Sequence, residues 1–440
     1  MSTGVETTPI LEPLRYPEQD PKLASKRFLD LASIVGPGFI LASVTVGNGE
    51  VFQATRGGAV FGYTILWTFV LGAIFKATVT YAAGRYMVIT GSQEPWLWAG
   101  IAWSLIAYVT LWVKNFSFVE NLQTAVVGLL VFFSVVALIV SQPDLGAMVR
   151  GLFLPEIPSA YPEWVQQKFP DVAAVAIPVE ILAYIGALGG GIYDYIGYIG
   201  TFREKTWGML GRADNADINL QLQALGKGEL IPIAMDEENL ARSGHGVKAV
   251  KIDSVSSFTA VGIFAITFMV LGVVILGTDG LQEVPGNNNI LTAQAAFFTT
   301  IHPVLKYLYM VAMWAVFWGS QQALLTTTYP YTFREAFAPA FPAVANPANW
   351  GKVKLGVATY TLGVAIFLAF TGVSYTTVIA FAGLLGGVFA LGLWGFILLF
   401  TEYKVLPKQL RMKPFLQVLL IISSVLMTVM GLIGLYQFFF

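Results

Sequence analysis

The chain has 440 residues, of which 56% are hydrophobic and 12% are charged, and its formal net charge is −1. Soluble domains carry about a quarter charged residues, so the composition indicates a polytopic α-helical membrane protein, and the near-zero net charge gives no electrostatic basis for nucleic-acid binding. The absence of cysteine excludes disulfides, thiolate metal sites and thiol nucleophiles. The two histidines, His245 and His302, lie far apart in the sequence, so we expect no histidine-rich metal cluster, no cofactor and no enzymatic activity.

Ten apolar segments are long enough to cross a bilayer as helices, which takes about 20 residues each. The polar residues 1–30 before them predict a cytoplasmic N-terminal tail, because Lys22, Lys26 and Arg27 stand close to the first span. The ten predicted spans are residues 31–55, 59–84, 96–113, 121–141, 174–200, 254–277, 298–327, 351–371, 375–401 and 414–437.

The first apolar segment, Leu31 to Gln53, contains the polar run Gly47-Asn48-Gly49-Glu50. A bilayer offers no water to a freed backbone, so such an interruption is tolerated only where it is buried in protein or lines a cavity. An ionisable side chain at this depth is a functional-site candidate by default. The run therefore predicts a discontinuous helix with a binding site at the interruption.

Glu50 is the strongest single candidate of this run, as an ion ligand, a proton carrier or the partner of a cationic substrate. The plainer interpretation is a carboxylate that caps the short helix after the break. Asn48 presents an amide that can coordinate a cation or hold an anion, or can simply hydrogen-bond to the broken backbone.

Lys76 lies deep in the second span, where two interpretations compete. Its ammonium can snorkel to the membrane interface, which we favour, or it can stay buried and pair with Glu50 or Asp194. A permanent positive charge at the site would argue against a divalent cation and for an anionic or neutral substrate.

The charges of the loops predict an orientation that ten spans cannot satisfy. The basic loop 203–253 belongs in the cytoplasm, and the segments 142–173 and 278–297 belong outside. With Arg85 inside, an odd number of crossings has to lie between Arg85 and residue 142, whereas two spans, 96–113 and 121–141, are found there. One crossing is therefore missing between Gly91 and Pro95, so either the sequence lacks a segment there or the topology is unusual.

A second interruption, Gly189-Gly190-Gly191-Ile192-Tyr193-Asp194, falls in the span at 174–200. Asp194 is a candidate second carboxylate of a site shared with Glu50, suited to a hard divalent cation, or an N-terminal cap of the half-helix that follows. Gly190, Gly191 and Tyr193 are further candidates for the binding site, and Glu180 at the start of the span is expected to be solvated. Two interrupted helices are the best sequence indication of a secondary transporter's site.

Two later glutamines, Gln321 and Gln322, are polar within a span and are candidates for lining the transport pathway. Hydrogen bonding between helices is the more common role of such residues. No Walker A phosphate-binding loop is present, which argues against ATP-driven pumping.

Several short strings of the chain form a pattern: Gly36-Pro37-Gly38-Phe39 through Phe61-Gly62-Tyr63, Gly84-Arg85, Thr90-Gly91, Gln142-Pro143-Asp144 with Gly146, and Arg203-Glu204-Lys205 with Trp207-Gly208. These strings resemble the Nramp (natural resistance-associated macrophage protein) family of proton-coupled transporters of divalent transition metals. The resemblance implies a LeuT-type inverted-repeat bundle whose first and sixth helices are discontinuous, and it places the missing crossing at the family's third helix.

This resemblance divides the chain into parts. The predicted parts are the tail at 1–30, a first repeat at 31–141, an extracellular loop at 142–173, a second repeat at 174–401 that includes the cytoplasmic loop 203–253, and a final helix at 402–440.

The chain departs from the family at the residues that would hold the metal. The family's first break reads Asp-Pro-Gly-Asn, whereas the same positions here are Gly47 to Glu50, and its second break supplies a Met, whereas Gly191 or Tyr193 occupies that position here. Thioether ligands favour soft metals, and carboxylates, carbonyls and water suit Mg, Ca and Mn. The family's transition-metal site is therefore not reproduced.

The leading hypothesis is a secondary active transporter in the cell membrane, with a hard divalent cation such as Mg2+ or Mn2+ held by Glu50, Asn48 and Asp194. The alternative is a small anion or organic solute, driven by Na+ or H+, because glycine-rich breaks expose helix N-termini that suit anions. A third hypothesis is a receptor-like or structural membrane protein that retains the fold without transport.

Overall fold

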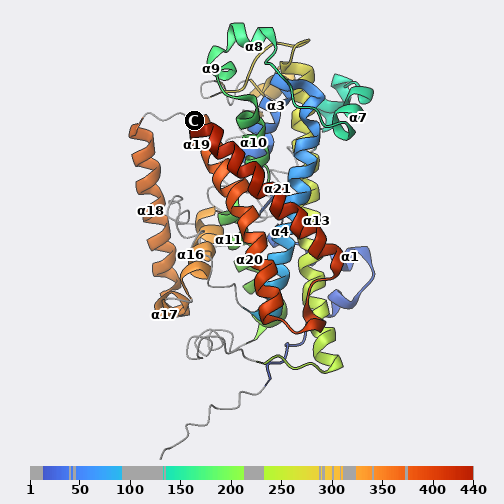
Figure 1. The fold of residues 1–440 in the computed structure, drawn as a ribbon, viewed down its shortest axis with the longest axis vertical. Helices are drawn as coiled ribbons and strands as arrows, with labels where there is room; N and C mark the ends of the chain where they lie inside the picture. Colours follow the sequence, from blue (N-terminus) through green and yellow to red (C-terminus); the bar gives the residue numbers. More distant parts are fainter. Residues whose placement is uncertain are drawn as a thin grey trace, which may run out of the picture.

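The protein is an elongated bundle of helices in the computed structural model (Figure 1). The structure describes residues 13–38, 41–42, 46–91, 132, 135–212, 232–286, 289, 293–299, 302–307, 309–310, 324–338, 341–371 and 375–439. The α-helices are α1 (Phe28–Ala32), α3 (Ala54–Phe61), α4 (Leu66–Thr90), α7 (Leu145–Phe153), α8 (Glu163–Lys168), α9 (Pro170–Ala173), α10 (Ile177–Ala187), α11 (Ile192–Gly200), α13 (Glu237–Leu271), α14 (Ala296–Thr299), α16 (Tyr329–Phe337), α17 (Pro342–Ala345), α18 (Trp350–Thr371), α19 (Tyr375–Ala382), α20 (Ala390–Val405) and α21 (Pro414–Phe439).

Within the described residues, four segments adopt the wider π-helix and six short stretches form 3-10 turns. The π-helical segments are η2 (Val46–Gln53), η6 (Gly272–Leu276), η7 (Leu324–Thr328) and η9 (Gly383–Phe389). The 3-10 turns are η1 (Pro21–Ala24), η3 (Gly62–Ile65), η4 (Thr201–Arg203), η5 (Gly208–Gly211), η8 (Pro347–Asn349) and η10 (Lys408–Leu410). The described residues form no β-sheet, only an isolated bridge between Leu14 and Ile233.

Four helical stretches of the described part are long and apolar enough to cross a membrane: Glu50–Thr90, Glu237–Leu276, Thr377–Val405 and Pro414–Phe439. A fifth crossing is formed if Val135–Ser141 and α7, which bend by 116° at their junction, are counted as one span. The prediction of an all-α, multi-pass membrane protein is therefore confirmed.

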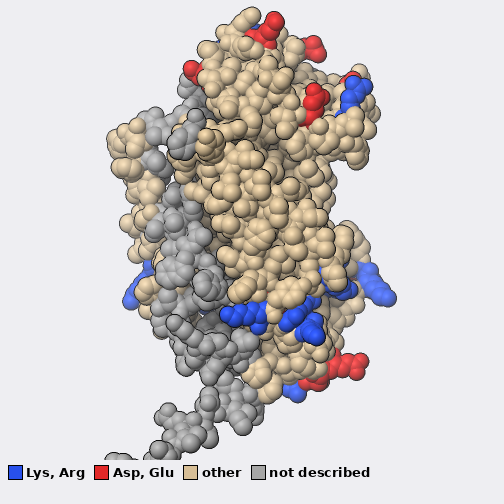
Figure 2. All heavy atoms as spheres, in the orientation of Figure 1, with Lys and Arg blue, Asp and Glu red and all other residues tan. Residues whose placement is uncertain are grey.

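The distribution of charge over the surface fits a membrane-embedded band. Figure 2 shows a broad tan belt with Lys and Arg concentrated toward its lower edge and several Asp and Glu at the upper end. Helix α21 crosses this belt with a row of exposed apolar side chains that a lipid phase would cover. They include Phe415, Val418, Ile421, Val425, Val429, Leu432 and Tyr436.

Helix α13 packs along α4 and α3 over much of its length. It begins at Glu237, so part of the segment predicted as loop 203–253 is helix. Asp236 caps this helix by accepting a hydrogen bond from the Asn239 amide at 3.0 Å, and that bond lowers the pKa of Asp236. Glu237 and Glu238 follow in the first turn, where the helix dipole favours them.

Two other predicted boundaries are displaced. The first span continues past residue 55 through α3, and the chain turns at Gly62, whose φ of +64° favours glycine. The boundary predicted at residue 402 falls inside α20, which runs to Val405. In both cases the prediction changed segment at polar or charged residues, Arg56 after the first span and Glu402 in the second case, and the helix continues through them.

Helix α3 lies so close to α13 that a methyl group does not fit between them. A Cβ built on Gly58 would stand 2.0 Å from the Met269 carbonyl oxygen. We expect Gly58→Ala to destabilise the protein by about 1–3 kcal/mol or more through overpacking, measured by thermal unfolding in detergent. Gly244→Ala is the matched control, because Gly244 is exposed on α13 with nothing near its Cβ, and it should be neutral or stabilising. Equal losses in both variants would contradict the close contact.

Candidate functional site

The second predicted break is present as a sharp interruption between α10 and α11. Helix α10 ends at Ala187, and α11 begins at Ile192. Between them Gly189 and Gly190 both have positive φ values, +68° and +83°. Two consecutive residues in this conformation need glycine, because a Cβ would be strained there. The glycines thus turn the backbone groups of the break out of helical geometry.

The Glu50 carboxylate lies against this break from the first span. Glu50 belongs to η2, so the first predicted interruption is a π-helical segment with backbone hydrogen bonds rather than an unwound stretch. π-helical turns are rare and occur frequently at functional sites. The side chain is fully buried, and its Oε1 accepts a hydrogen bond from the Gly189 amide at 2.6 Å. Its other oxygen, Oε2, is buried without a hydrogen-bond partner.

The Lys76 ammonium approaches the same break from α4. It donates to the carbonyl oxygens of Gly186 at 2.7 Å and Gly190 at 2.8 Å, and also to that of Leu188. The side chain is completely buried, and no ion pair with a carboxylate is found for it among the described residues. The favoured prediction that Lys76 snorkels to the interface is therefore wrong, and its direct partner is neither Glu50 nor Asp194.

Asp194 is the third buried charge at the break. Its Oδ2 accepts a hydrogen bond from the Gly191 amide at 2.9 Å, which is the reach-back contact of a residue at the third position of a helix. The capping role that we weighed for Asp194 is thus present. Glu50, Lys76 and Asp194 together cover the freed N–H and C=O groups from Gly186 to Gly191.

The aromatic residues after the break pack against it. Tyr193 lies against the backbone of Gly191 and of Gly386 in η9, and its ring meets the Tyr329 ring edge-on at 6.3 Å between centroids. The Tyr195 hydroxyl donates to the Gly190 carbonyl at 3.3 Å. These contacts cover the α11 side of the break with aromatic surface.

The remaining predicted residues are placed only in part. The backbone of Gly47 and Asn48 runs in η2, but the Asn48 side chain lies outside what the structure describes. Gln321 and Gln322 also lie outside the described residues, as does the junction at Gly91–Pro95 beyond its first residue. Among the described residues, no group of three or more His, Asp or Glu side chains is arranged to hold a metal ion.

A buried ion pair above the break was missed by sequence reasoning. Arg56 on α3 donates through Nε to Glu180 on α10 at 2.5 Å and through Nη1 to the Pro285 carbonyl at 3.1 Å, and the Tyr184 hydroxyl donates to the same Glu180 oxygen at 2.7 Å. Arg56 and Glu180 are only 5% and 7% exposed. The expectation that Glu180 is solvated is therefore wrong.

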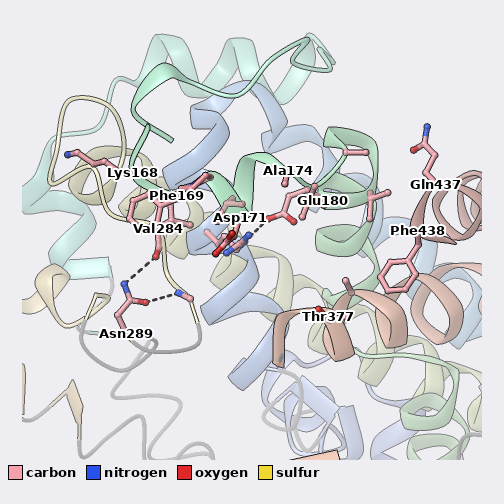
Figure 3. A pocket seen from close by; sticks show the side chains of 18 residues that line it. Lys168, Phe169, Asp171, Ala174, Glu180, Val284, Asn289, Thr377, Gln437 and Phe438 are labelled. Carbon is pink, nitrogen blue, oxygen red and sulfur yellow. Dashed lines mark hydrogen bonds and ion pairs between the residues drawn. The ribbon is translucent and has the colours of Figure 1, made fainter. Parts of the chain in front are cut away.

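This pair lies in the wall of a cavity of about 810 Å3 at the acidic end of the molecule. Figure 3 shows Glu180 pointing into the space between Asn289 on one side and Thr377 and Phe438 on the other. The walls come from α3, α9, α10, α19, α21 and the segment around Val284. We call this cavity the vestibule, and it lies on the side of the break where Arg56 and Glu180 form their ion pair.

A further buried carboxylate, Asp253 on α13, holds the start of the first span. It accepts hydrogen bonds from the amides of Gly36 at 2.8 Å and Gly38 at 2.7 Å, and from the Tyr198 hydroxyl at 2.7 Å. Two of these donors belong to the Gly36-Pro37-Gly38 string that carries the family resemblance. A carboxylate at the N-terminal end of a helix is favoured by the freed N–H groups and by the helix dipole.

Arg85, which we used as a cytoplasmic loop charge, is instead a buried helical residue. It pairs with Glu402 on α20 at 2.7 Å and donates to the Leu410 carbonyl. Arg203 makes a similar pair with Glu335 at 2.7 Å. These pairs lie toward the basic end of the bundle and connect distant helices.

Comparison with known proteins gives relatives by sequence and by fold, although no protein-family model matches the chain. The divalent metal cation transporter MntH of Yersinia pestis is 26% identical over 173 residues, which covers 29% of this chain and 42% of that protein. MntH of Yersinia enterocolitica is 23% identical over 229 residues, covering 41% of this chain and 52% of the relative. The matched region therefore spans about half or less of the curated relatives' length.

The fold extends the likeness to nearly the whole chain. A crystal structure of a mutant Eremococcus coleocola manganese transporter superposes with a TM-score of 0.62 at 15% identity, covering 97% of this chain and 89% of that one. A second structure of that transporter, in complex with an aromatic bis-isothiourea compound, gives a TM-score of 0.60 at 15% identity, covering 97% and 90%.

The fold and the two modified helices around the break define a multi-pass membrane protein of the LeuT-type transporter architecture. By sequence the chain is similar to the MntH transporters of the Nramp family over part of its length, and by fold it is similar to a manganese transporter over nearly all of it. The resemblance inferred from the short strings is confirmed.

Proposed function

We propose that this protein is a secondary transporter that carries a hard divalent cation, of the Mg2+ or Mn2+ class, past the break between α10 and α11. One observation carries the proposal: the fully buried Glu50 carboxylate holds the Gly189 amide with one oxygen and leaves the other without a partner. A buried polar atom without a partner is costly, and a cation would satisfy it. The named activity of the MntH relatives and of the manganese transporter supports a metal as the cargo.

The chemistry of the site favours a hard cation over a soft one. Glu50 and Asp194 offer carboxylate oxygens, and Asn48 stands in the same π-helical segment as Glu50. Oxygen ligands suit Mg2+ and Mn2+, and Mg2+ would keep several of its waters. We further propose that H+ or Na+ drives the cycle and that the N-terminus is cytoplasmic, since the basic end of the molecule would then face inside.

The bundle supplies a means of alternating access. Arg56 and Glu180 join α3 to α10 on the vestibule side of the break, so these two segments would move together. Asp253 joins the start of the first span to α11 and α13 on the other side. We propose that the substrate is exposed to one side when α3 and α10 move together away from the rest of the bundle, and to the other side when the Asp253 contacts loosen.

The second candidate function is transport of an anionic or neutral solute, and the buried Lys76 ammonium favours it. Its three carbonyl partners are the groups that a cation would otherwise coordinate. An ammonium ion next to the site also repels a divalent cation.

A flux experiment separates the two candidates. The wild-type protein is reconstituted into proteoliposomes, and the uptake of Mn2+, Mg2+, Ca2+ and small carboxylates is measured. We expect saturable divalent-cation uptake that falls at least about tenfold in Glu50→Gln, because one charge-assisted contact is worth about 1.5–3 kcal/mol. Glu163→Gln, which alters an exposed carboxylate on α8, is the control and should retain full uptake.

Two results would count against the cation site. Divalent-cation binding that survives Glu50→Gln, Asn48→Ala and Asp194→Asn combined would place the site elsewhere. Uptake of a carboxylate without metal binding would establish the second candidate instead.

A further inference from the structure

We propose that the Lys76 ammonium is a built-in monovalent cation: it occupies a carbonyl cage at the α10–α11 break that would bind Na+ or K+ if the lysine were absent. The cage consists of the carbonyl oxygens of Gly186, Leu188 and Gly190. The binding part of this inference rests on the geometry alone, and its consequence for transport rests on the proposed function.

The three oxygens converge on one point because of the local fold. Gly186 lies in the last turn of α10, where carbonyls have no helical partner. Leu188 caps that helix in an extended conformation, and the positive φ values of Gly189 and Gly190 redirect the chain beyond it. The carbonyls of alternate residues 186, 188 and 190 thereby reach one ammonium group.

A ring of backbone carbonyls is also how proteins bind dehydrated monovalent cations, since the oxygens replace the ion's hydration shell. The end of α10 adds the negative end of its helix dipole, which favours a cation. Glu50 and Asp194 place two further carboxylates at the same break. The cage is therefore negative in the absence of Lys76.

Burial of Lys76 shows that the protein tolerates the cost of this charge rather than avoiding it. The side chain is completely buried in a membrane span, where an uncompensated ammonium costs several kcal/mol. A lysine with no specific role at this depth would extend its ammonium to the membrane interface. The Lys76 ammonium instead binds three backbone carbonyls, and we infer that the break needs a positive charge to remain folded.

The Lys76 ammonium differs from a dissolved ion because it is covalently attached to the protein and cannot leave the site. The wild-type transport cycle would therefore need no Na+ or K+ at this cage. Na+ dependence, if it arises at all, would have to come from another place in the fold. Lys76 would in this way determine the cation specificity of the transporter without itself carrying the substrate.

The test is thermal unfolding of purified full-length protein in detergent, in choline, sodium and potassium chloride of equal ionic strength. We expect the wild-type Tm to be the same in all three salts. Lys76→Met should unfold at a lower Tm in choline and recover part of the loss in sodium or potassium, with a Tm that rises with salt concentration and saturates. Lys354→Met, at a lysine that lies over the Trp350 ring, is the control and should show no ion-specific shift.

Lys76→Gln provides a second variant if Lys76→Met does not fold, because its amide still donates to part of the cage. The proposal is overturned if sodium and potassium raise the Tm of the folded variant no more than they raise that of the wild type. Uptake measurements on the same preparations separate the two proposals. An ion-specific Tm shift without uptake of any solute overturns only the proposed function, whereas uptake without the shift overturns only this inference.

Discussion

Replacing Arg56 by methionine is expected to lower the free energy of unfolding by about 3–5 kcal/mol, the usual cost of removing one partner of a buried ion pair. The loss arises because Glu180, 7% exposed, would keep a buried charge with only the Tyr184 hydroxyl against it. The Pro285 carbonyl would lose its donor as well. Denaturant titration of the detergent-solubilised protein measures the change.

Two further variants identify the charge as the cause. Arg56→Met combined with Glu180→Gln should recover much of the loss, because the amide still accepts from Tyr184 but leaves no buried charge. Arg15→Met removes one partner of the exposed pair with Asp236 and should leave stability unchanged, since exposed pairs contribute little. A double variant no more stable than Arg56→Met would show that packing, not charge, is responsible.

The same variant tests the mechanical role of the pair. Arg56 and Glu180 come from the two segments that flank the break on the vestibule side. If they move together, Arg56→Met should reduce uptake even at temperatures where the protein is folded. Uptake unchanged under those conditions would limit the pair to a structural role.

The interruptions themselves could be predicted from the sequence because they are local. A triple glycine inside an apolar span strongly disfavours a continuous helix, and the structure confirms the break at Gly189 to Gly191. Burial of Glu50 followed from its place between apolar residues, and the cap formed by Asp194 followed from its distance to the glycines. The π-helical form of the first segment did not follow, because its residue pattern is also that of an unwound helix.

The partners of the buried charges could not be predicted, because they are distant in sequence. Lys76 reaches carbonyls 110 to 114 positions away, and Arg56 reaches Glu180 across 124 positions. A single sequence holds no record of which distant groups meet. A sequence also gives no sign of which backbone carbonyls accept a side-chain hydrogen bond, since every residue has a carbonyl group.

The start of α13 is different, because a signal was present and was given too little weight. Asp236 followed by Glu237 and Glu238 is a typical helix start. The polar composition of residues 237–253 favoured a loop, but a helix that extends beyond the apolar band needs polar residues there. Hydropathy thus located the membrane crossing and not the helix.

Replacing Asp253 by alanine is expected to release the start of the first span. Two buried donors, the amides of Gly36 and Gly38, would lose their acceptor, and the Tyr198 hydroxyl would keep only its contact with the Ser254 hydroxyl at 3.1 Å. Each buried donor left without a partner costs about 1–3 kcal/mol. Local opening of residues 34–38 should therefore become more frequent by at least about tenfold, because about 1.4 kcal/mol corresponds to that factor.

The chain has no cysteine, so a single introduced thiol reports this opening without background. Ile34 is 7% exposed, and the Ile34→Cys thiol should react slowly with a maleimide in the otherwise wild-type protein. Adding Asp253→Ala should raise the labelling rate at least about tenfold. Asp253→Asn should have a smaller effect because its amide oxygen still accepts one bond.

Asp30→Ala is the control for these rates, since it removes a nearby carboxylate that contacts Ser25 and not the Gly36-Pro37-Gly38 string. Equal labelling of Ile34→Cys in all backgrounds would mean that apolar packing alone holds the first span closed. A rate that rises with Asp253→Ala and falls again when substrate is added would link this carboxylate to access from its side of the membrane, because substrate at the break would then favour the state in which the first span is held.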